Sequence, residues 1–498
     1  MVQFAPAAAL QWLSCLWGPD ALDMNPLALS ESEYRLVYER MSRLALDYLA
    51  GLNQRSCFPG LSAIEASNLF AGPLPEQGMG PAALDDLTKV VAASRAQGPR
   101  FFGYVLGSGE PIAAGADLLA SVLNQNVTAW RSGPAAVSIE HLVVGWLAQA
   151  IGCEGFRGSL AGGGSSANLM GLAMARESRL PANENGVREV GTVYASEQAH
   201  MSIAKAVALL GIGRHQLRLI PCDDEFRIRT DLLRGSIDAD RRAGKRPVAI
   251  VGCAGTVATG SIDPLVELAE IAKGTGAWFH IDGAYGALAA IARPEPFAGM
   301  ELADSISLDP HKWLYQPLDC GCLLFRDPAQ ARATFSFTGD YAKSLQDDPL
   351  EDFAFFDESL ELSRRFRALK LWLSLRYHGL GNFRRQIEND LNCANQLAWL
   401  VDSNPEMELL APVPLSAVCF RYIPRGDGFK ETQLDDLNLR ILRDVQRSGR
   451  VYISNATIHG KFALRACMVN HRTTAADVEA VIDEVLRVGR ELSTGAQS

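Results

Sequence analysis

Between about residues 136 and 325, short apolar runs rich in β-branched residues alternate with segments that have the apolar spacing of a helix. Short apolar strands that alternate with helices indicate a largely parallel sheet with helices on both faces. We therefore predict an α/β fold with a mostly parallel central sheet, and we expect ligands at the carboxyl ends of its strands. The expected strands are 192–195, 216–220, 247–252, 277–281, 304–308 and 321–325.

Helical patterns dominate the two ends of the chain. Residues 30–52 predict an amphipathic helix in which Ser30 and Glu33 have the form of a capping box, and residues 82–96 predict another helix. Beyond the sheet, a long helical stretch is expected over 363–403. A small α+β domain is expected to close the chain, with strands at 416–422, 450–453 and 462–468 and a final helix at about 474–493.

The composition excludes several classes of protein. Of 498 residues, 48% are hydrophobic and 21% are charged, which is ordinary for a globular protein and argues against disorder. A formal charge of −10 argues against nucleic-acid binding. Ten scattered cysteines, with one unaccompanied Cys-x-Cys at Cys320 and Cys322 and no His-x-x-x-His pair, predict free thiols and no metal site.

Residues 1–23 are apolar but contain no Lys or Arg. A signal peptide needs a positive segment before its apolar core, so secretion is not expected. The stretch is also too short and too interrupted by Pro and Gly to span a bilayer. We expect a cytoplasmic protein without membrane contact. Two explanations of the segment stay open, because it could pack on a partner subunit or Met24 could be the natural start.

A lysine with a specific setting follows the expected strand 304–308, in the run DPHKW (309–313). Proline biases Asp309 toward extended geometry, so His311 and Lys312 fall in a turn at the strand end. Aromatic and apolar neighbours partly desolvate the lysine, which favours its neutral, nucleophilic form and suits a Schiff-base lysine. A lone lysine is more often a surface residue whose stem covers apolar side chains.

A carboxylate ends the neighbouring strand. Asp282 follows the run 277–281 and precedes Gly283 and Ala284, which leave room for a flat ring. A buried carboxylate needs a partner, and a protonated pyridine nitrogen would be one. The alternative is an ordinary helix N-cap.

Three glycines, Gly162 to Gly164, precede Ser165 and open a helical run. Exposed backbone N–H groups at a helix N-terminus favour an anion, so this segment fits a phosphate cup. Neither GxxxxGK[ST] nor GxGxxG is present. A Gly-Ser run alone is more often a plain loop.

Two further side chains belong to the same edge of the sheet. His200 follows the strand 192–195 and could stack on an aromatic ligand, although a lone histidine is more often structural. Thr256 follows the strand 247–252. A phosphate cup, a stacking ring, a hydroxyl, a carboxylate and a Schiff-base lysine are together what pyridoxal phosphate needs.

The chain resembles the group II pyridoxal-phosphate-dependent decarboxylases, the aromatic-L-amino-acid and glutamate decarboxylase family, from about residue 30 to 490. The resemblance rests on GGSSAN (163–168), SEQAH (196–200), HIDGAYG (280–286) and DPHKW (309–313), which match in order and spacing. It implies fold type I, the aspartate aminotransferase-like fold. It also implies a Schiff base at Lys312, Asp282 on the pyridine nitrogen, and His200 and Ala284 on the two ring faces. Thr256 would lie near the ring, and Gly164, Ser165 and His311 at the phosphate.

The resemblance also implies a catalytic tyrosine on a mobile loop. Tyr341 lies 29 residues after Lys312, as in the family, and would return a proton to the α-carbon so that the product is the amine. Aromatic aldehyde synthases of the family carry phenylalanine there. Residues 328–355 are polar and weakly periodic, as expected of a lid.

The substrate is expected to be an aromatic L-amino acid. Trp313 after the lysine is typical of the aromatic branch, and Phe101 and Tyr104 match its substrate loop. Gly107 and Ser138 depart from the family pattern, in which threonine and glutamate are common. Alternatives that stay open are glutamate, diaminobutyrate or cysteine sulfinate as substrate, an aldehyde synthase, a transaminase, and a degenerate binding scaffold.

The resemblance finally implies a homodimer with shared active sites. We predict an N-terminal helical dimerisation segment over 1–110, a large cofactor-binding α/β domain over 111–369 and a small α+β domain over 370–498. Arg364 begins a helix that either braces the active site or faces solvent.

Overall fold

The computed structural model describes residues 27–337, 353–426 and 428–494. The chain divides into two compact units, Met1–Arg55 with Pro59–Arg95 and Ser56–Phe58 with Ala96–Ser498. None of the helices in the described ranges is both long and apolar enough to cross a membrane.

The described part of the first unit is helical. It contains α2 (Glu31–Gly51), η1 (Leu52–Gln54), α3 (Ala63–Leu69), η2 (Gly80–Asp86) and α4 (Leu87–Ala93). The predicted capping box is confirmed, because Ser30 Oγ accepts from the Glu33 amide at 3.3 Å and Glu33 Oε2 accepts from the Ser30 amide at 2.7 Å. No residue of α2, α3, η2 or α4 is buried.

A seven-stranded sheet forms the centre of the second unit, in the order β1-β7-β6-β5-β4-β2-β3. Strands β3, β2, β4, β5 and β6 are parallel, and β7 is antiparallel to both β6 and β1. All six predicted strands are confirmed, which supports the predicted α/β class. They are β2 (Gly191–Ser196), β3 (Leu217–Ile220), β4 (Arg246–Cys253), β5 (Trp278–Asp282), β6 (Ser305–Leu308) and β7 (Gly321–Phe325).

Strand β1 (Arg157–Ala161) was missed, because RGSLA has neither a β-branched run nor alternation. Its place depends on tertiary pairing with β7, and a Cβ on Gly158 would lie 2.1 Å from the Leu323 carbonyl oxygen. The glycine therefore allows the two backbones to approach, and the strand covers the edge of β7.

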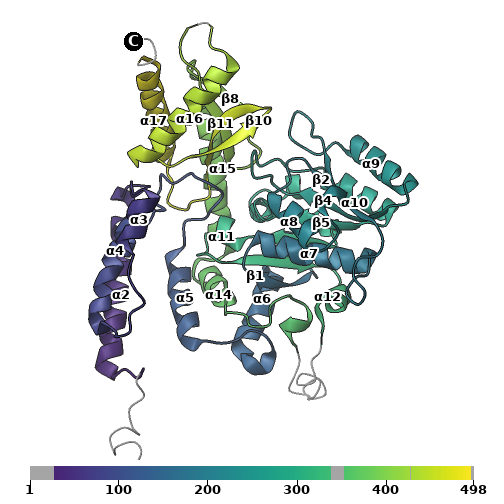
Figure 1. Cartoon of the computed structure of the whole chain (residues 1–498), viewed down its shortest axis with the longest axis horizontal. Helices are drawn as coiled ribbons and strands as arrows, with labels where there is room; N and C mark the ends of the chain where they lie inside the picture. The colour runs from purple at the N-terminus through teal and green to yellow at the C-terminus, as the bar shows by residue number, and fades with distance from the viewer. Residues whose placement is uncertain (1–26, 338–352, 427, 495–498) are drawn as a thin grey trace, which may run out of the picture. The chain divides into compact units, whose positions relative to one another are not determined.

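Helices cover both faces of this sheet (Figure 1). In β4, Ile250 joins a core with α6 (Pro134–Ala150) and α10 (Leu265–Thr275), whereas Val251 joins a second core with α7 (Gly164–Arg179) and α8 (Met201–Leu209). Both side-chain sets of the strand are thus buried, which explains the continuous apolar run in the sequence. Other helices between α4 and the end of α14 are α5 (Pro111–Leu123), α9 (Thr230–Arg242), α11 (Pro310–Trp313), α12 (Pro328–Phe335) and α14 (Ala368–His378).

A four-stranded sheet in the order β10-β11-β9-β8 forms the α+β part at the end of the chain. Strands β9 (Ala417–Tyr422) and β11 (Lys461–Cys467) confirm two predictions. The strand predicted at 450–453 is wrong, because only Tyr452 pairs there, with Phe101, and β10 begins at Ser454. The remaining elements are β8 (Met407–Leu409), β10 (Ser454–Ile458), α15 (Leu380–Asp402), α16 (Glu431–Ser448) and α17 (Ala475–Thr494).

The long helix predicted over 363–403 is two helices. Gly379 has φ 76° and separates α14 from α15. A left-handed glycine ends the first helix and turns the chain, a break that the apolar spacing on either side conceals.

Candidate active site

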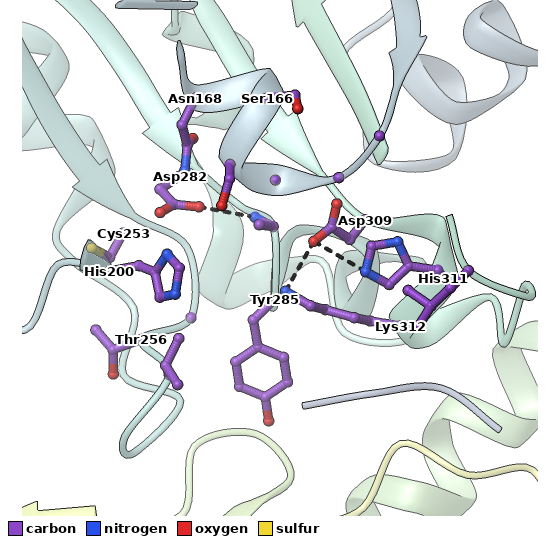
Figure 2. Close-up of a pocket in the computed structure, with 18 of the residues that line it drawn as sticks. Ser166, Asn168, His200, Cys253, Thr256, Asp282, Tyr285, Asp309, His311 and Lys312 are labelled. Carbon is purple, nitrogen blue, oxygen red and sulfur yellow. Dashed lines mark hydrogen bonds and ion pairs between the residues drawn. The ribbon is translucent and has the colours of Figure 1, made fainter. Parts of the chain in front are cut away.

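A cavity of about 280 Å³ lies at the carboxyl ends of the parallel strands (Figure 2). It collects residues from the start of α7, the β2–α8 turn, the loop after β4, the end of β5 and the β6–α11 turn. All eight residues predicted to bind the cofactor line it: Gly164, Ser165, His200, Thr256, Asp282, Ala284, His311 and Lys312. The structure thus brings together positions spread over 149 residues of sequence.

The N-terminus of α7 forms one wall. Its N-cap is Gly163, with φ 138°, and no side chain caps the helix there. A Cβ on Gly164 would lie 2.6 Å from the Ala284 Cβ, so only glycine fits against the end of β5. Uncapped N–H groups at the start of a 16-residue helix suit an anion. This wall therefore fits the phosphate of pyridoxal phosphate.

Lys312 lies on α11, held by a buried carboxylate. Its Nζ is 3.0 Å from Asp309 Oδ2, and His311 Nε2 is 3.5 Å from the same oxygen (Figure 2). His311 Nδ1 donates to the Cys320 carbonyl at 2.7 Å, and burial lowers the pKa of this imidazole. The other oxygen of Asp309 is buried without a hydrogen-bond partner in the described structure. The sequence predicted only an extended backbone for Asp309 and no role for its carboxylate.

Asp282 ends β5 with its side chain 7% exposed overall. Its Oδ1 accepts from the Ser307 hydroxyl and from the Ala284 backbone N–H, both at 3.2 Å. Among the described residues, none donates to Oδ2. A carboxylate with one oxygen fixed and one directed to the cavity fits a protonated ring nitrogen.

His200 is the N-cap of α8, and its Nδ1 accepts from the Ser202 backbone N–H at 3.3 Å. Burial lowers the pKa of His200, which keeps the ring neutral and suited to stacking on another ring. Thr256 follows β4 and its hydroxyl lies 3.0 Å from that of Thr259. A Cβ on Gly255, with φ 103°, would lie 2.8 Å from Gly286 Cα, so the glycine lets this loop reach the cavity.

Phe101 and Tyr104, predicted to bind substrate, do not line this cavity. Phe101 is 3% exposed and stacks on Tyr452 at 5.0 Å, and the Tyr104 hydroxyl lies 3.1 Å from that of Tyr452. Their substrate role stays a prediction. Tyr341 lies outside the described residues, as does most of the predicted lid, whose first part is the helix α12.

Two departures from the family pattern have structural reasons. Gly107 donates its N–H to the His311 carbonyl at 3.1 Å, and a Cβ there would lie 2.4 Å from that oxygen. A threonine would not fit behind the lysine in this loop conformation. Ser138 donates back to Pro134 of its own helix at 2.8 Å, and the buried glutamate on this helix is Glu140.

Arg364 is buried and does not face the cavity. It pairs with Glu140 and donates to the carbonyl oxygens of Val127 and Leu160, both at 2.8 Å. The solvent-facing alternative for Arg364 is therefore wrong. Its place is that of a brace between the start of the α14 segment, α6 and β1.

Asn168 was missed, although it stands in the GGSSAN run and lines the cavity. Its amide donates to the Ser202 hydroxyl at 3.0 Å, and its carbonyl oxygen lies 2.9 Å from His280 Nε2. Its position four residues after Gly164, in the first turns of the helix that opens the cup, was the available signal.

Comparisons with known proteins agree with this site. The model described as "Pyridoxal-dependent decarboxylase conserved domain" matches residues 81–423. An aromatic-L-amino-acid decarboxylase of Bacillus atrophaeus is 32% identical over 473 residues, covering 94% of this chain and 98% of that protein. A phenylacetaldehyde synthase of Petunia hybrida is 33% identical over 386 residues, covering 74% of this chain and 76% of that protein.

A solved structure, Oryza sativa TDC with PLP and tryptamine, aligns with a TM-score of 0.86 at 26% identity. The alignment covers 94% of this chain and 99% of that one. The family model spans more than half of the chain, and the Bacillus atrophaeus relative is covered almost completely. This chain therefore belongs to the family of pyridoxal-phosphate-dependent decarboxylases.

Proposed function

We propose that this protein decarboxylates aromatic L-amino acids to the corresponding amines and CO2. The observation that carries the proposal is the meeting, in one cavity, of the α7 N-terminus, the Asp282 carboxylate and Lys312 beside the His200 ring. The aromatic preference is supported by the relative named aromatic-L-amino-acid decarboxylase and by the structural neighbour that contains tryptamine.

Each residue has a distinct task in this proposal. Lys312 holds the cofactor covalently, the backbone N–H groups of Gly164 and Ser165 bind its phosphate together with His311, and Asp282 keeps a proton on its ring nitrogen. His200 and Ala284 confine the ring, and Thr256 borders it. Bound pyridoxal phosphate supplies an electron-accepting ring that takes up the electron pair left at the α-carbon when CO2 departs.

Tyr341 is the proton donor in this proposal. A hydroxyl that protonates the substrate α-carbon yields the amine, and a covering lid keeps bulk water from the site. Phe101 and Tyr104 are proposed to contact the aromatic side chain of the substrate. Production of an aldehyde is the second candidate function, favoured by the similarity to a phenylacetaldehyde synthase.

We propose that the protein works as a homodimer with shared active sites, in which residues 1–110 contact the second subunit. In α2 the apolar residues Leu36, Met41 and Leu46 are 41%, 43% and 66% exposed in the single chain. Apolar side chains spaced along one helix, none of them buried, are typical of a subunit interface. A cytoplasmic location stays a prediction, in keeping with the nine free thiols in the described ranges.

The test is a CO2-release assay of the cofactor-loaded enzyme across the twenty common amino acids plus dopa, diaminobutyrate and cysteine sulfinate. Amine and aldehyde are both quantified. We expect CO2 and amine in equal amounts from tryptophan, tyrosine, phenylalanine or dopa, and none with Lys312→Ala. Release only from an acidic or aliphatic amino acid would contradict the aromatic preference, and equal amounts of aldehyde and CO2 would favour the second candidate.

A further inference from the structure

A continuous series of hydrogen bonds runs from His200 into the core behind the cavity. His200 Nδ1 lies 2.8 Å from the Ser202 hydroxyl oxygen, which accepts from the Asn168 side-chain amide at 3.0 Å. Asn168 and His200 both line the cavity (Figure 2), and Ser202 is buried beneath them. The ring nitrogen that faces the core is therefore held by a second side chain, not by solvent.

The series continues across the sheet to β5 and β6. The Asn168 carbonyl oxygen lies 2.9 Å from His280 Nε2, and His280 Nδ1 lies 2.8 Å from the Ser305 hydroxyl. The indole Nε1 of Trp278 donates to the same hydroxyl oxygen at 2.8 Å. We call this set the relay; it consists of Trp278, Ser305, His280, Asn168, Ser202 and His200.

The direction of every hydrogen bond in the relay follows from the N–H groups at its two ends, the backbone N–H of Ser202 and the indole N–H of Trp278. Each of these groups can only donate. At the near end, the Ser202 backbone N–H donates to His200 Nδ1 at 3.3 Å. That nitrogen is then an acceptor, so the Ser202 hydroxyl also donates to it. The hydroxyl oxygen is left to accept from the Asn168 amide, which turns the Asn168 carbonyl toward His280.

The far half then has one consistent arrangement. The Asn168 carbonyl can only accept, so His280 carries its proton on Nε2 and accepts at Nδ1. The Ser305 hydroxyl donates to that Nδ1. Its oxygen accepts from the indole N–H of Trp278, a group that can only donate. Burial lowers the pKa of His280 to about 4, so its ring is neutral at pH 7, as this arrangement requires.

The packing around His280 fixes the relay in place. His280, Ser305 and Asn168 are 0%, 0% and 1% exposed. A Cβ on Gly171 would lie 2.6 Å from His280 Cε1 and 3.2 Å from Ser305 Oγ. The imidazole thus packs directly on the backbone of α7, away from solvent.

We propose that Asn168, Ser202 and His280 are positioning residues that hold His200 in the neutral form with its proton on Nε2. Nε2 is the one ring nitrogen of His200 that the relay leaves to the cavity. The ring therefore presents a hydrogen-bond donor to whatever binds there, and not a base. The relay includes Asn168 of α7 and His280 of β5. Buried residues of the sheet therefore determine which nitrogen of His200 carries the proton.

This inference rests on the proposed function only for the identity of the ligand that contacts His200. The proton positions on the His200 ring can be measured whatever that ligand is. The experiment uses cofactor-loaded enzyme labelled with ¹⁵N-histidine. His200 is assigned by the loss of its signals in His200→Gln. The wild type should show a protonated Nε2 and an unprotonated Nδ1 at His200. Ser202→Ala keeps the backbone N–H at Nδ1 but removes the hydroxyl that donates to it, so the His200 Nδ1 resonance should shift toward that of a protonated nitrogen, while Ser202→Thr, which keeps the hydroxyl, should give the wild-type spectrum.

Two variants separate positioning from stability. Ser159→Ala removes another fully buried hydroxyl, in β1, outside the relay, and should leave the His200 signals unchanged. Ser305→Ala acts at the far end without touching His200 and should change the His280 signals first. In variants that remove the side-chain hydrogen bonds of Asn168 or Ser202, kcat/KM for the amino acid should fall roughly 10- to 100-fold. Loss of a partner that fixes a histidine tautomer has an effect of this size in other proteins.

Protonation of His200 Nδ1 in the wild type would overturn the proposal. So would a Ser202→Ala spectrum identical to the wild type in a protein that folds. If Ser202→Ala does not fold, the wild-type tautomer and the Ser305→Ala spectrum decide the question, because unchanged His280 signals in Ser305→Ala would contradict the relay. Absence of CO2 release from the wild type would contradict the proposed function and would leave the tautomer measurement valid.

Discussion

Asp309 places a negative charge beside the proposed phosphate cup. Its Oδ2 is 3.1 Å from the position of a Cβ on Gly164, at the start of α7, while its Oδ1 has no partner in the described structure. The same carboxylate holds the Lys312 ammonium group at 3.0 Å. A phosphate bound at α7 would meet a like charge, and Lys312 must leave Asp309 before it can react with an aldehyde.

We therefore expect Asp309→Asn to bind pyridoxal phosphate more tightly than the wild type, by roughly tenfold, equivalent to about 1.4 kcal/mol. The measurement is a titration of cofactor-free protein. The affinity of Asp309→Asn for pyridoxal, which lacks the phosphate, should increase less.

The matched control is Asp319→Asn, which removes a carboxylate near Gly162 that is held by Arg367. It should change the affinity little. Weaker binding of pyridoxal phosphate by Asp309→Asn would show that the carboxylate supports the cup and would contradict this account of it.

Tyr341→Phe tests the proposed proton donor. Without the hydroxyl, protonation of the α-carbon should slow by about 10²-fold or more. The product should then shift from amine toward aldehyde, ammonia and peroxide, with dissolved O2 as the two-electron oxidant that is reduced to peroxide. Peroxide and both organic products are measured after a single turnover. An unchanged amine yield without peroxide would remove Tyr341 from the mechanism.

Residue by residue, the cofactor contacts could be predicted from sequence because each combines a recognisable side chain with a strand end. The hydrogen bonds of Asn168 could not be predicted, because its partners Ser202 and His280 lie 34 and 112 residues away and only its place in the first turns of α7 gave a local signal. Local spacing carries no information on such pairs. Phe101 shows the opposite case. Its position in the sequence matches the substrate loop of the family, yet in the single chain its ring packs on Tyr452.

At the scale of elements, the fold was predictable where periodicity was strong. Strands β2 and β4 to β7 are buried on both faces and read as apolar runs, and α2 carries its own capping box. Strand β1 and the break at Gly379 were not predictable, because one depends on pairing with β7 and the other on a single φ angle. The start of β10 at Ser454 likewise depends on its register with β11.

One helix contact makes stability depend on pH. Asp390 of α15 accepts from the Tyr315 hydroxyl at 2.9 Å and from the Asn470 backbone N–H at 3.1 Å. Burial raises the pKa of Asp390 to about 7. The native protein therefore keeps a proton that the unfolded chain loses above about pH 4. The stability from this group is complete below that pH and is lost as the pH rises to about 7.

We expect Asp390→Asn to be relatively more stable as the pH rises, with Tm increasing against the wild type by about 1–3 °C between pH 5 and pH 8. Thermal unfolding at several pH values measures this difference. Asp402→Asn, an exposed carboxylate at the end of the same helix, is the control and should show no trend. A constant difference between Asp390→Asn and wild type at all pH values would contradict the buried proton.

For the whole molecule, the proposed dimer accounts for the first unit, in which α2, α3 and α4 have no buried residue. Leu46→Glu places a charge at an apolar position that is 66% exposed and should weaken the dimer by at least tenfold in dissociation constant. Light scattering during size-exclusion chromatography measures the mass. Ser42→Glu adds the same charge at an exposed polar position of α2 and should leave the dimer intact; equal effects of both variants would contradict an apolar interface.

We expect this cavity to hold pyridoxal phosphate through Lys312. Reduction of the loaded enzyme with borohydride, followed by digestion and peptide mass spectrometry, locates the cofactor, because the reduced linkage survives digestion. Lys312 should carry the mass of one phosphopyridoxyl group per chain, and the corresponding peptide of Lys312→Ala should carry none. A modified lysine elsewhere, or no modification of a protein saturated with cofactor, would contradict it.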